Sequence, residues 1–272
     1  MNGNGLISLA IIAVTVFFSY KGINDRAFFK RYSFGVDKVL LYKNYKVMLT
    51  SGLVHVNWLH LIFNMVSLFI FSQGLETYLG PWKFLLIYVL SLFGGNLFSL
   101  FVHRRHGDYT AAGASGAVCG LIFASIALFP GMNIMFIPAW LFGIIYVLYS
   151  IYGIRSNASN IGHEAHLAGA LIGMLCAIAM SPEVLSVNYL PISVILVLMI
   201  VFIYIIMMKP GMLQIDNRFF KTHEHHTIDD RYNLARHNKQ QELDRILEKI
   251  HNKGMGSLTR KEKDFLKEVN GK

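Results

Sequence analysis

Four polar residues stand in otherwise apolar stretches of the sequence and could carry out chemistry. His60 and Asn64 are four residues apart, so a helix would place both on one face. Ser115 lies in the sequence Gly-Ala-Ser-Gly, and His166 lies in Ala-His-Leu-Ala-Gly. A serine hydroxyl becomes a nucleophile when a neighbouring histidine takes its proton. The types of these residues therefore indicate acyl-transfer chemistry, provided that the fold brings them together.

The composition places these residues in a lipid bilayer. Of the 272 residues, 54% are hydrophobic and 15% are charged, whereas a soluble domain has about 25% charged residues. This excludes a disordered chain and gives no reason to expect a nucleic-acid partner. A bilayer span needs roughly 20 apolar residues. Seven stretches approach this length almost free of charged residues: 6–20, 54–75, 84–102, 111–129, 132–154, 162–180 and 191–208.

Alternation of the spans predicts that three of the polar residues lie at similar depth. The second, fourth and sixth spans all enter the membrane from one side. His60, Ser115 and His166 lie about four to six residues from the starts of these spans, which places them within roughly 10 Å of one surface. Because buried polar groups in membranes are costly, each is a candidate functional residue.

Small residues stand beside both Ser115 and His166 in the sequence. Gly113 and Gly116 flank Ser115, and Gly169 follows His166. Such residues allow two helix backbones to approach closely, which would bring the serine hydroxyl within hydrogen-bond reach of the histidine. Taken alone, each cluster is equally compatible with ordinary packing between membrane helices.

Taken in order, the clusters resemble those of the rhomboid intramembrane serine proteases. The similarity covers about residues 1–181 and includes LTSGLVH at 49–55, HLIFNM at 60–65, and the serine and histidine motifs described above. One departure is that Lys46 and Val47 stand where many members carry an aromatic residue and an arginine, so no role is transferred to this position.

The resemblance implies a role for each polar residue. Ser115 would be the nucleophile and His166 the general base of a Ser–His dyad. His60, Asn64 and the backbone N–H of Ser115 would stabilise the oxyanion. The implied substrates are transmembrane or membrane-proximal segments of other proteins, and neither a cofactor nor a metal is implied. The sequence itself also favours a dyad, since Glu164 lies two residues from His166 and should point away from it.

Two other functions compete with this one. A metal-dependent hydrolase or transporter could use the buried histidines, but His163-Glu164-Ala165-His166 is one residue short of the His-Glu-x-x-His signature. An inactive rhomboid-like protein that binds membrane proteins is disfavoured because both Ser115 and His166 are present.

The predicted fold is an all-α polytopic membrane protein with a polar tail. We expect a six-helix core over 1–181, an additional transmembrane helix within 182–208 and a tail over 209–272. In the tail, helical spacing of apolar residues from Leu243 to Ile250, and a capping box at Thr259 and Glu262, predict a helical hairpin at about 231–270.

Two connections are also predicted from composition. Residues 21–46 mix aromatic and basic side chains, which favours a loop lying against lipid headgroups. Pro130-Gly131 predicts a tight two-residue turn between the fourth and fifth spans.

The orientation in the membrane has two conflicting predictions. Seven Lys and Arg residues lie in 21–46 alone, and the opposite side of the membrane has only Lys83. The positive-inside rule therefore places the basic side, and the site, toward the cytoplasm. Resemblance to bacterial rhomboids implies an inner-membrane protein with the reverse orientation, in which the site opens outward.

Overall fold

The computed structural model describes a membrane unit and parts of a second unit. The units span Met1–Arg218 and Phe219–Lys272. The described residues are 5–134, 136–156, 162–208, 243, 245–250, 256, 258–259, 262 and 265–266.

The membrane unit is built from apolar helices, as predicted. Five are long and apolar enough to cross a bilayer: α1 (Leu6–Asn24), α5 (Trp58–Leu79), α6 (Pro81–Val102), α9 (His163–Met180) and α10 (Val184–Met208). Two further apolar helices are shorter: α7 (Ser115–Leu128) and α8 (Ala139–Ser156). The prediction of an all-α polytopic membrane protein is therefore confirmed.

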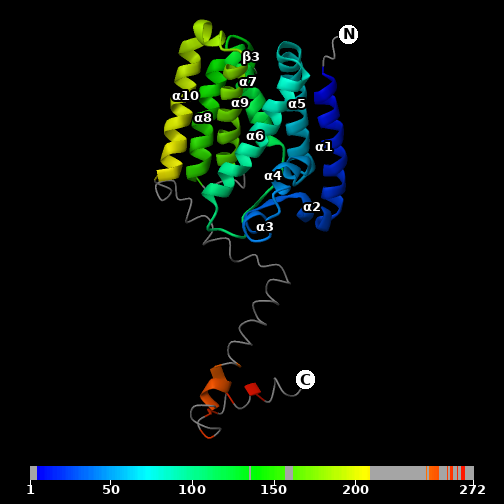
Figure 1. The fold of residues 1–272 in the computed structure, drawn as a ribbon, viewed down its shortest axis with the longest axis vertical. Helices are drawn as coiled ribbons and strands as arrows, with labels where there is room; N and C mark the ends of the chain where they lie inside the picture. Colours follow the sequence, from blue (N-terminus) through cyan, green and yellow to red (C-terminus); the bar gives the residue numbers. More distant parts are fainter. Residues whose placement is uncertain are drawn as a thin grey trace. The chain divides into compact units, whose positions relative to one another are not determined.

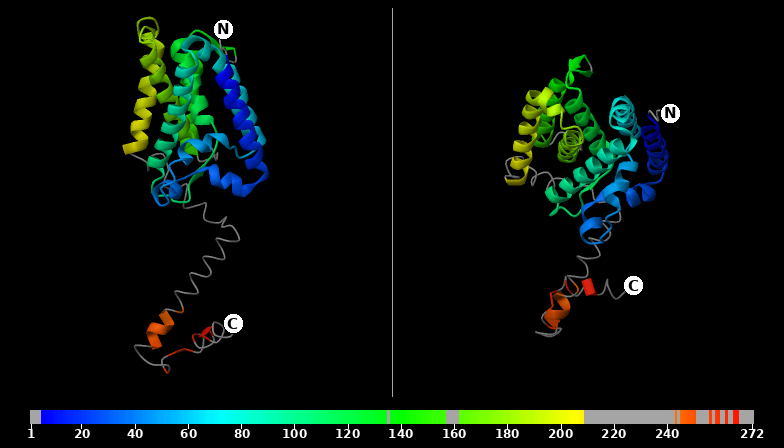
Figure 2. Two further views of the ribbon diagram at one scale, coloured as in Figure 1. Left: turned by 45° about the vertical axis from the view of Figure 1, so that its right-hand side comes forward. Right: turned by 45° about the horizontal axis from the view of Figure 1, so that its top comes forward.

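Helix α7 forms the centre of this unit. It packs against α9, α6 and α5, while α1 packs against α5, and α8 packs against α10 (Figures 1 and 2). Every residue of α7 after Ser115 is buried. With 14 residues, α7 is about 21 Å long, which is less than the ~30 Å hydrocarbon core of a bilayer. At least one of its ends therefore lies within the thickness of the membrane.

Glycines set the distance between α7 and α9. A Cβ atom at Gly169 would lie 2.2 Å from the carbonyl oxygen of Gly116, and one at Gly173 would lie 2.1 Å from that of Gly120. Any larger residue at Gly169 or Gly173 would collide with the backbone of α7. Gly116 itself has room for a Cβ, since the nearest atom would be 3.6 Å away. Gly116 contributes its backbone to the contact.

The prediction of a loop over residues 21–46 is wrong. Helix α1 continues to Asn24, and the following chain forms several short elements: α2 (Arg26–Tyr32), β1 (Phe34–Gly35), α3 (Val36–Leu40), α4 (Val47–Thr50) and the 3-10 helix η1 (Ser51–Leu53). The side chain of Asp25 caps α2 by accepting two backbone N–H bonds. Strand β1 pairs antiparallel with β2 (Thr110–Ala111).

The two-residue turn predicted at Pro130-Gly131 is also wrong. Helix α7 ends at Leu128 and α8 begins only at Ala139. The connection contains a small antiparallel ladder of β3 (Asn133–Ile134) and β4 (Ile137–Pro138). Pro138 has no N–H to donate, which suits the position just before the first turn of a helix.

Helix α10 is interrupted near its start. Asn188 has non-helical backbone angles (φ −116°, ψ 23°), and Pro191 lies inside the helix three residues later. Proline removes a backbone hydrogen bond and clashes with the preceding turn. The span predicted at 191–208 corresponds to the part of α10 that follows this kink.

The second unit contains the predicted capping box. The backbone N–H of Thr259 donates to Glu262 Oε2 (2.7 Å), and the backbone N–H of Glu262 donates to Thr259 Oγ1 (3.3 Å). Lys249 Nζ also donates to Glu262 Oε2 (2.8 Å). Ile246 and Leu258 are buried within this unit. These contacts confirm the capping box. Most of the helical hairpin predicted at about 231–270 lies outside the described residues.

Candidate active site

Ser115 and His166 lie in direct contact. The Nε2 atom of His166 is 2.6 Å from the Oγ atom of Ser115. Ser115 is the first residue of α7, and His166 lies in the first turn of α9. The close packing of α7 and α9 brings the two side chains together. Both are half-buried, so the pair remains partly accessible.

The other nitrogen of His166 faces a tyrosine. The hydroxyl of Tyr146, on α8, lies 3.4 Å from His166 Nδ1. The same hydroxyl lies 2.9 Å from the Sγ atom of Cys119, one turn beyond Ser115 on α7. Sequence reasoning missed Tyr146, because a tyrosine in an apolar span is usually only a packing residue.

Glu164 points away from His166, as its spacing in the helix predicts. Its Oε1 atom accepts hydrogen bonds from the Tyr109 hydroxyl (2.7 Å) and Ser99 Oγ (3.3 Å), and it lies 3.2 Å from His103 Nε2. The carboxylate is buried. These contacts tie the start of α9 to the end of α6 and to the loop that follows it.

His60 and Asn64 occupy one face of α5 close to the start of α7. A Cβ atom at Gly113 would lie 2.6 Å from Cε1 of His60, and Gly113 has a φ of +128°. Both the space and the backbone angle therefore favour glycine here. Asn64 is buried, and its Nδ2 donates to the carbonyl oxygen of His60 (2.8 Å). Among the described residues, no hydrogen bond joins Asn64 to Ser115 or His166.

His55 fixes the residue before the serine, a contact that sequence reasoning also missed. Its Nε2 accepts from the backbone N–H of Ala114 (3.2 Å), so its Nδ1 must donate to Ser19 Oγ (2.9 Å). The Ser19 hydroxyl in turn donates to the carbonyl oxygen of Leu53 (3.0 Å). Burial, and secondarily the nearby His60, lowers the pKa of His55 to about 3. His55 is therefore neutral and connects α1 to the start of α7.

The start of α7 also offers a backbone donor. Because the helix begins at Ser115, the N–H of Ser115 has no acceptor within the helix. A free N–H beside a nucleophilic hydroxyl is the kind of group that stabilises a developing oxyanion. The arrangement thus places a hydroxyl, an imidazole and a backbone N–H donor close together at the start of α7.

The histidines at 163 and 166 face different surroundings. The ring of His163 makes an edge contact with Tyr149 on α8 (5.5 Å between ring centroids), whereas His166 faces Ser115. In the part of the chain that the structure describes, no three His, Cys, Asp or Glu side chains are grouped so that they could hold a metal ion.

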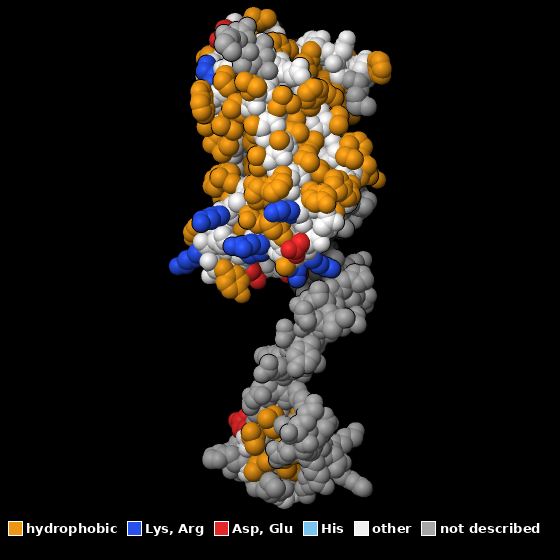
Figure 3. All heavy atoms as spheres, turned by 90° about the vertical axis from the view of Figure 1, so that its right-hand side faces the viewer, with side chains coloured by type: hydrophobic (Ala, Val, Ile, Leu, Met, Phe, Trp, Pro, Cys, Tyr) orange, Lys and Arg blue, Asp and Glu red, His pale blue; other side chains and the backbone are white. Residues whose placement is uncertain are grey.

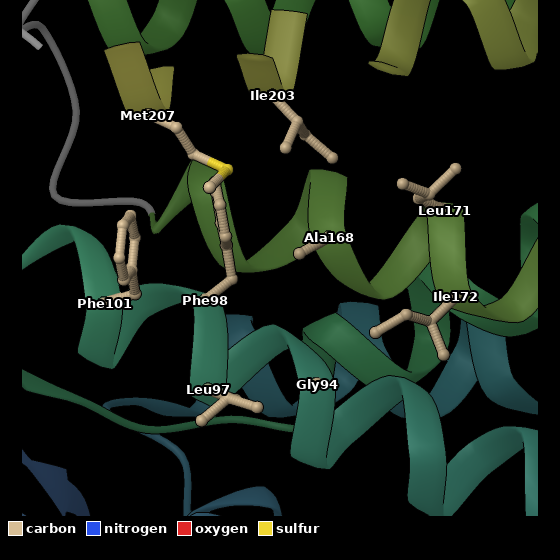
Figure 4. Close-up of a pocket in the computed structure, with 9 residues that line it drawn as sticks. All are labelled: Gly94, Leu97, Phe98, Phe101, Ala168, Leu171, Ile172, Ile203 and Met207. Atoms are coloured by element: carbon tan, nitrogen blue, oxygen red, sulfur yellow. The ribbon is translucent and has the colours of Figure 1, made fainter. Parts of the chain in front are cut away.

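An apolar hollow lies between α6, α9 and α10. It has a volume of about 290 Å³ and is lined by side chains such as Phe98, Ile172 and Met207 (Figure 4). Its lining residues are aliphatic or aromatic, with one methionine and one glycine. They supply no acid, base or nucleophile, so the candidate chemistry lies at the start of α7.

Comparison with known families gives two matches. Residues 43–183 match the family described as Rhomboid domain, and residues 226–272 match a family of unknown function, DUF6576. The first match includes the four polar residues with which the sequence analysis began. The second match falls on the tail.

Curated relatives include proteins of bacteria, plants and yeast. The chain is 31% identical over 182 residues to "Rhomboid protease AarA" of Providencia stuartii, covering 57% of this chain and 64% of the relative. It is 26% identical over 192 residues to "RHOMBOID-like protein 12, mitochondrial" of Arabidopsis thaliana, covering 62% of this chain and 56% of the relative. It is 31% identical over 133 residues to "Rhomboid protease GluP" of Bacillus subtilis, covering 49% of this chain and 25% of the relative. The chain therefore spans less than two thirds of each of these relatives.

Proposed function

Because the chain belongs to the rhomboid family, whose domain covers residues 43–183, we propose that it is an intramembrane serine endopeptidase. It would cleave transmembrane or membrane-proximal segments of other membrane proteins. The observation that carries the proposal is the contact of 2.6 Å between Ser115 Oγ and His166 Nε2. This is the geometry that a histidine base needs to activate a serine.

The reaction would follow from this geometry. His166 Nε2 accepts the hydroxyl proton while Ser115 Oγ attacks the carbonyl carbon of the substrate, and the protonated His166 then gives that proton to the leaving amine. Water then gives a proton to His166 Nε2 and attacks the acyl carbon, and the histidine returns that proton to Ser115 Oγ as the bond between Oγ and the acyl carbon breaks. The backbone N–H of Ser115 would bind the oxyanion, with His60 and Asn64 as further donors. For Asn64, this role requires its amide to leave the carbonyl of His60 in the substrate complex.

The place of the site restricts the substrate. Because Ser115 lies at the end of a short helix within the membrane unit, a substrate segment must bring its peptide bond to that depth. A membrane helix hides its peptide bonds in internal hydrogen bonds. The cleaved segment should therefore unwind easily, and membership of the rhomboid family implies a small residue at the cleaved bond.

Site-directed variants test the proposed dyad. Ser115→Ala and His166→Ala should each abolish cleavage of a reporter transmembrane protein in proteoliposomes. Ser125→Ala is the matched control, because Ser125 lies on the same helix and its hydroxyl donates only to the Leu121 carbonyl within that helix. Undiminished cleavage by Ser115→Ala would disprove the dyad. Loss of wild-type activity on adding a chelator would favour the metal-dependent alternative.

Kinetics test the oxyanion role of Asn64. Loss of one oxyanion donor typically lowers turnover by about 10²–10³. Asn64→Ala should therefore lower kcat much more than it raises KM. A change in KM alone would assign Asn64 to substrate binding.

Cysteine labelling tests the orientation. Figure 3 shows the Lys and Arg side chains of the membrane unit gathered mainly at the end that carries the short helices α2 and α3. The positive-inside rule places this end in the cytoplasm of a bacterial cell. Arg105→Cys should then be protected from an impermeant reagent in intact cells, and Lys83→Cys should be labelled. The opposite pattern would show that the site opens outward, as in the orientation implied for bacterial rhomboids.

A further inference from the structure

The side chain of Tyr146 connects the candidate dyad to a third helix. Its hydroxyl lies 3.4 Å from His166 Nδ1 and 2.9 Å from Cys119 Sγ. These contacts form one chain of polar atoms, from Ser115 through His166 and Tyr146 to Cys119. This series of polar contacts joins α7, α8 and α9.

The donor and the acceptor in each of these contacts follow from one requirement. If the hydroxyl of Ser115 donates to His166 Nε2, the neutral imidazole carries its proton on Nδ1. That Nδ1–H can only donate, so the oxygen of Tyr146 must accept. The phenolic proton is then directed toward Cys119 Sγ, which can accept a weak hydrogen bond.

Aromatic packing fixes the direction of the tyrosine. Its ring lies edge-on to Phe123 of α7 (5.6 Å between centroids) and stacks against Phe142 one turn earlier on α8 (6.1 Å, 25° between ring planes). With the ring held on both sides, the hydroxyl can move little away from His166. The distance of 3.4 Å is long for a hydrogen bond, but such contacts at catalytic histidines commonly shorten once substrate is bound.

We propose that Tyr146 is the positioning residue of His166, a role that rests on the proposed peptidase activity. By accepting from Nδ1–H, the phenol selects the tautomer whose Nε2 can act as a base. It also stabilises the imidazolium that forms when Ser115 attacks. In a Ser–His–Asp triad, a carboxylate serves the same purpose. Placing a carboxylate at membrane depth, however, costs several kcal/mol. A neutral phenol supplies the acceptor without that charge.

Tyr146→Phe tests this role because it keeps the ring and removes only the hydroxyl. We expect kcat to fall about 10- to 100-fold with little change in KM, as a part of the ~10²–10⁴ that general-base catalysis contributes. The acid limb of the kcat/KM profile should move to lower pH, because the imidazolium has lost an acceptor. Tyr152→Phe is the control, since Tyr152 lies on the same helix with 68% of its surface exposed.

The other groups around His166 stay constant in this comparison. They are His60 on α5, Cys119 on α7, and His163 and Glu164 on α9 itself. A difference between Tyr146→Phe and wild type in the position of the acid limb therefore reports the phenol. An unchanged kcat and an unchanged limb would overturn the proposal.

A spectroscopic measurement separates this proposal from the proposed function. In ¹⁵N-histidine NMR spectra of the full chain in micelles, His166 should populate the Nδ1–H tautomer, and Tyr146→Phe should shift the population toward Nε2–H. This readout needs no turnover. A tautomer ratio that is the same in both proteins would refute the positioning role, even if the protein cleaves substrates. An inactive wild type that shows the expected shift would refute only the peptidase function.

Discussion

Glu164 should be a main support of the active-site architecture. Its Oε1 atom is 2.7–3.3 Å from Tyr109, His103 and Ser99. Hydrogen bonds in membrane proteins contribute about 0.6 kcal/mol on average and at most ~1.7 kcal/mol. Three such bonds give about 2–5 kcal/mol for Glu164→Ala.

The free energy of unfolding in mixed micelles measures this loss. The protein is titrated from a mild detergent into SDS, and unfolding is followed by tryptophan fluorescence. Glu183→Ala is the matched control, because Glu183 is exposed just before α10 and a surface change is expected to stay within about 0.5 kcal/mol. If Glu164→Ala also stayed within that range, the carboxylate would not hold α9 in place.

Three further predictions concern residues outside the dyad. Gly169→Ala should lower the free energy of unfolding by about 1–3 kcal/mol, because the new methyl group would lie 2.2 Å from the Gly116 oxygen, whereas Gly74→Ala, with no atom within 4 Å, should not. Glu76→Ala should speed amide hydrogen exchange in the first turn of α1, where two N–H groups donate to this carboxylate (3.0 and 3.1 Å), and unchanged exchange would contradict the prediction. The pKa of His55 is lowered from 6.5 to about 3, so the unfolded chain binds a proton that the folded protein does not. The contribution of His55 to the free energy of unfolding is therefore complete above pH 6.5. Between pH 6.5 and pH 3 it decreases by up to ~1.4 kcal/mol per pH unit, and His55→Gln should remove this decrease.

The transmembrane helices could be predicted because the bilayer fixes their length. Apolar stretches without charged residues mark spans almost regardless of the rest of the fold. The small residues beside Ser115 and His166 also carried usable information, because they favour a close helix pair. The spacing of Glu164 and His166 correctly placed their side chains in different directions.

The elements that were missed depend on specific contacts. Residues 21–46 read as an interfacial loop because their composition is mixed, but Asp25 caps a helix there and Phe34 pairs with Ala111, far away in the sequence. Tyr146 and His55 could not be assigned roles because their partners come from other helices. A tyrosine in an apolar span does give one signal, since its hydroxyl needs a partner away from water.

Mapping of a serine-directed phosphonate probe tests the central claim most directly. The full chain in micelles is labelled with a fluorophosphonate, digested and analysed by mass spectrometry. A single modified peptide that carries the adduct on Ser115 is expected, with labelling lost in His166→Ala and unaffected by a chelator. An adduct on another serine, or equal labelling of Ser115 in His166→Ala, would contradict the dyad.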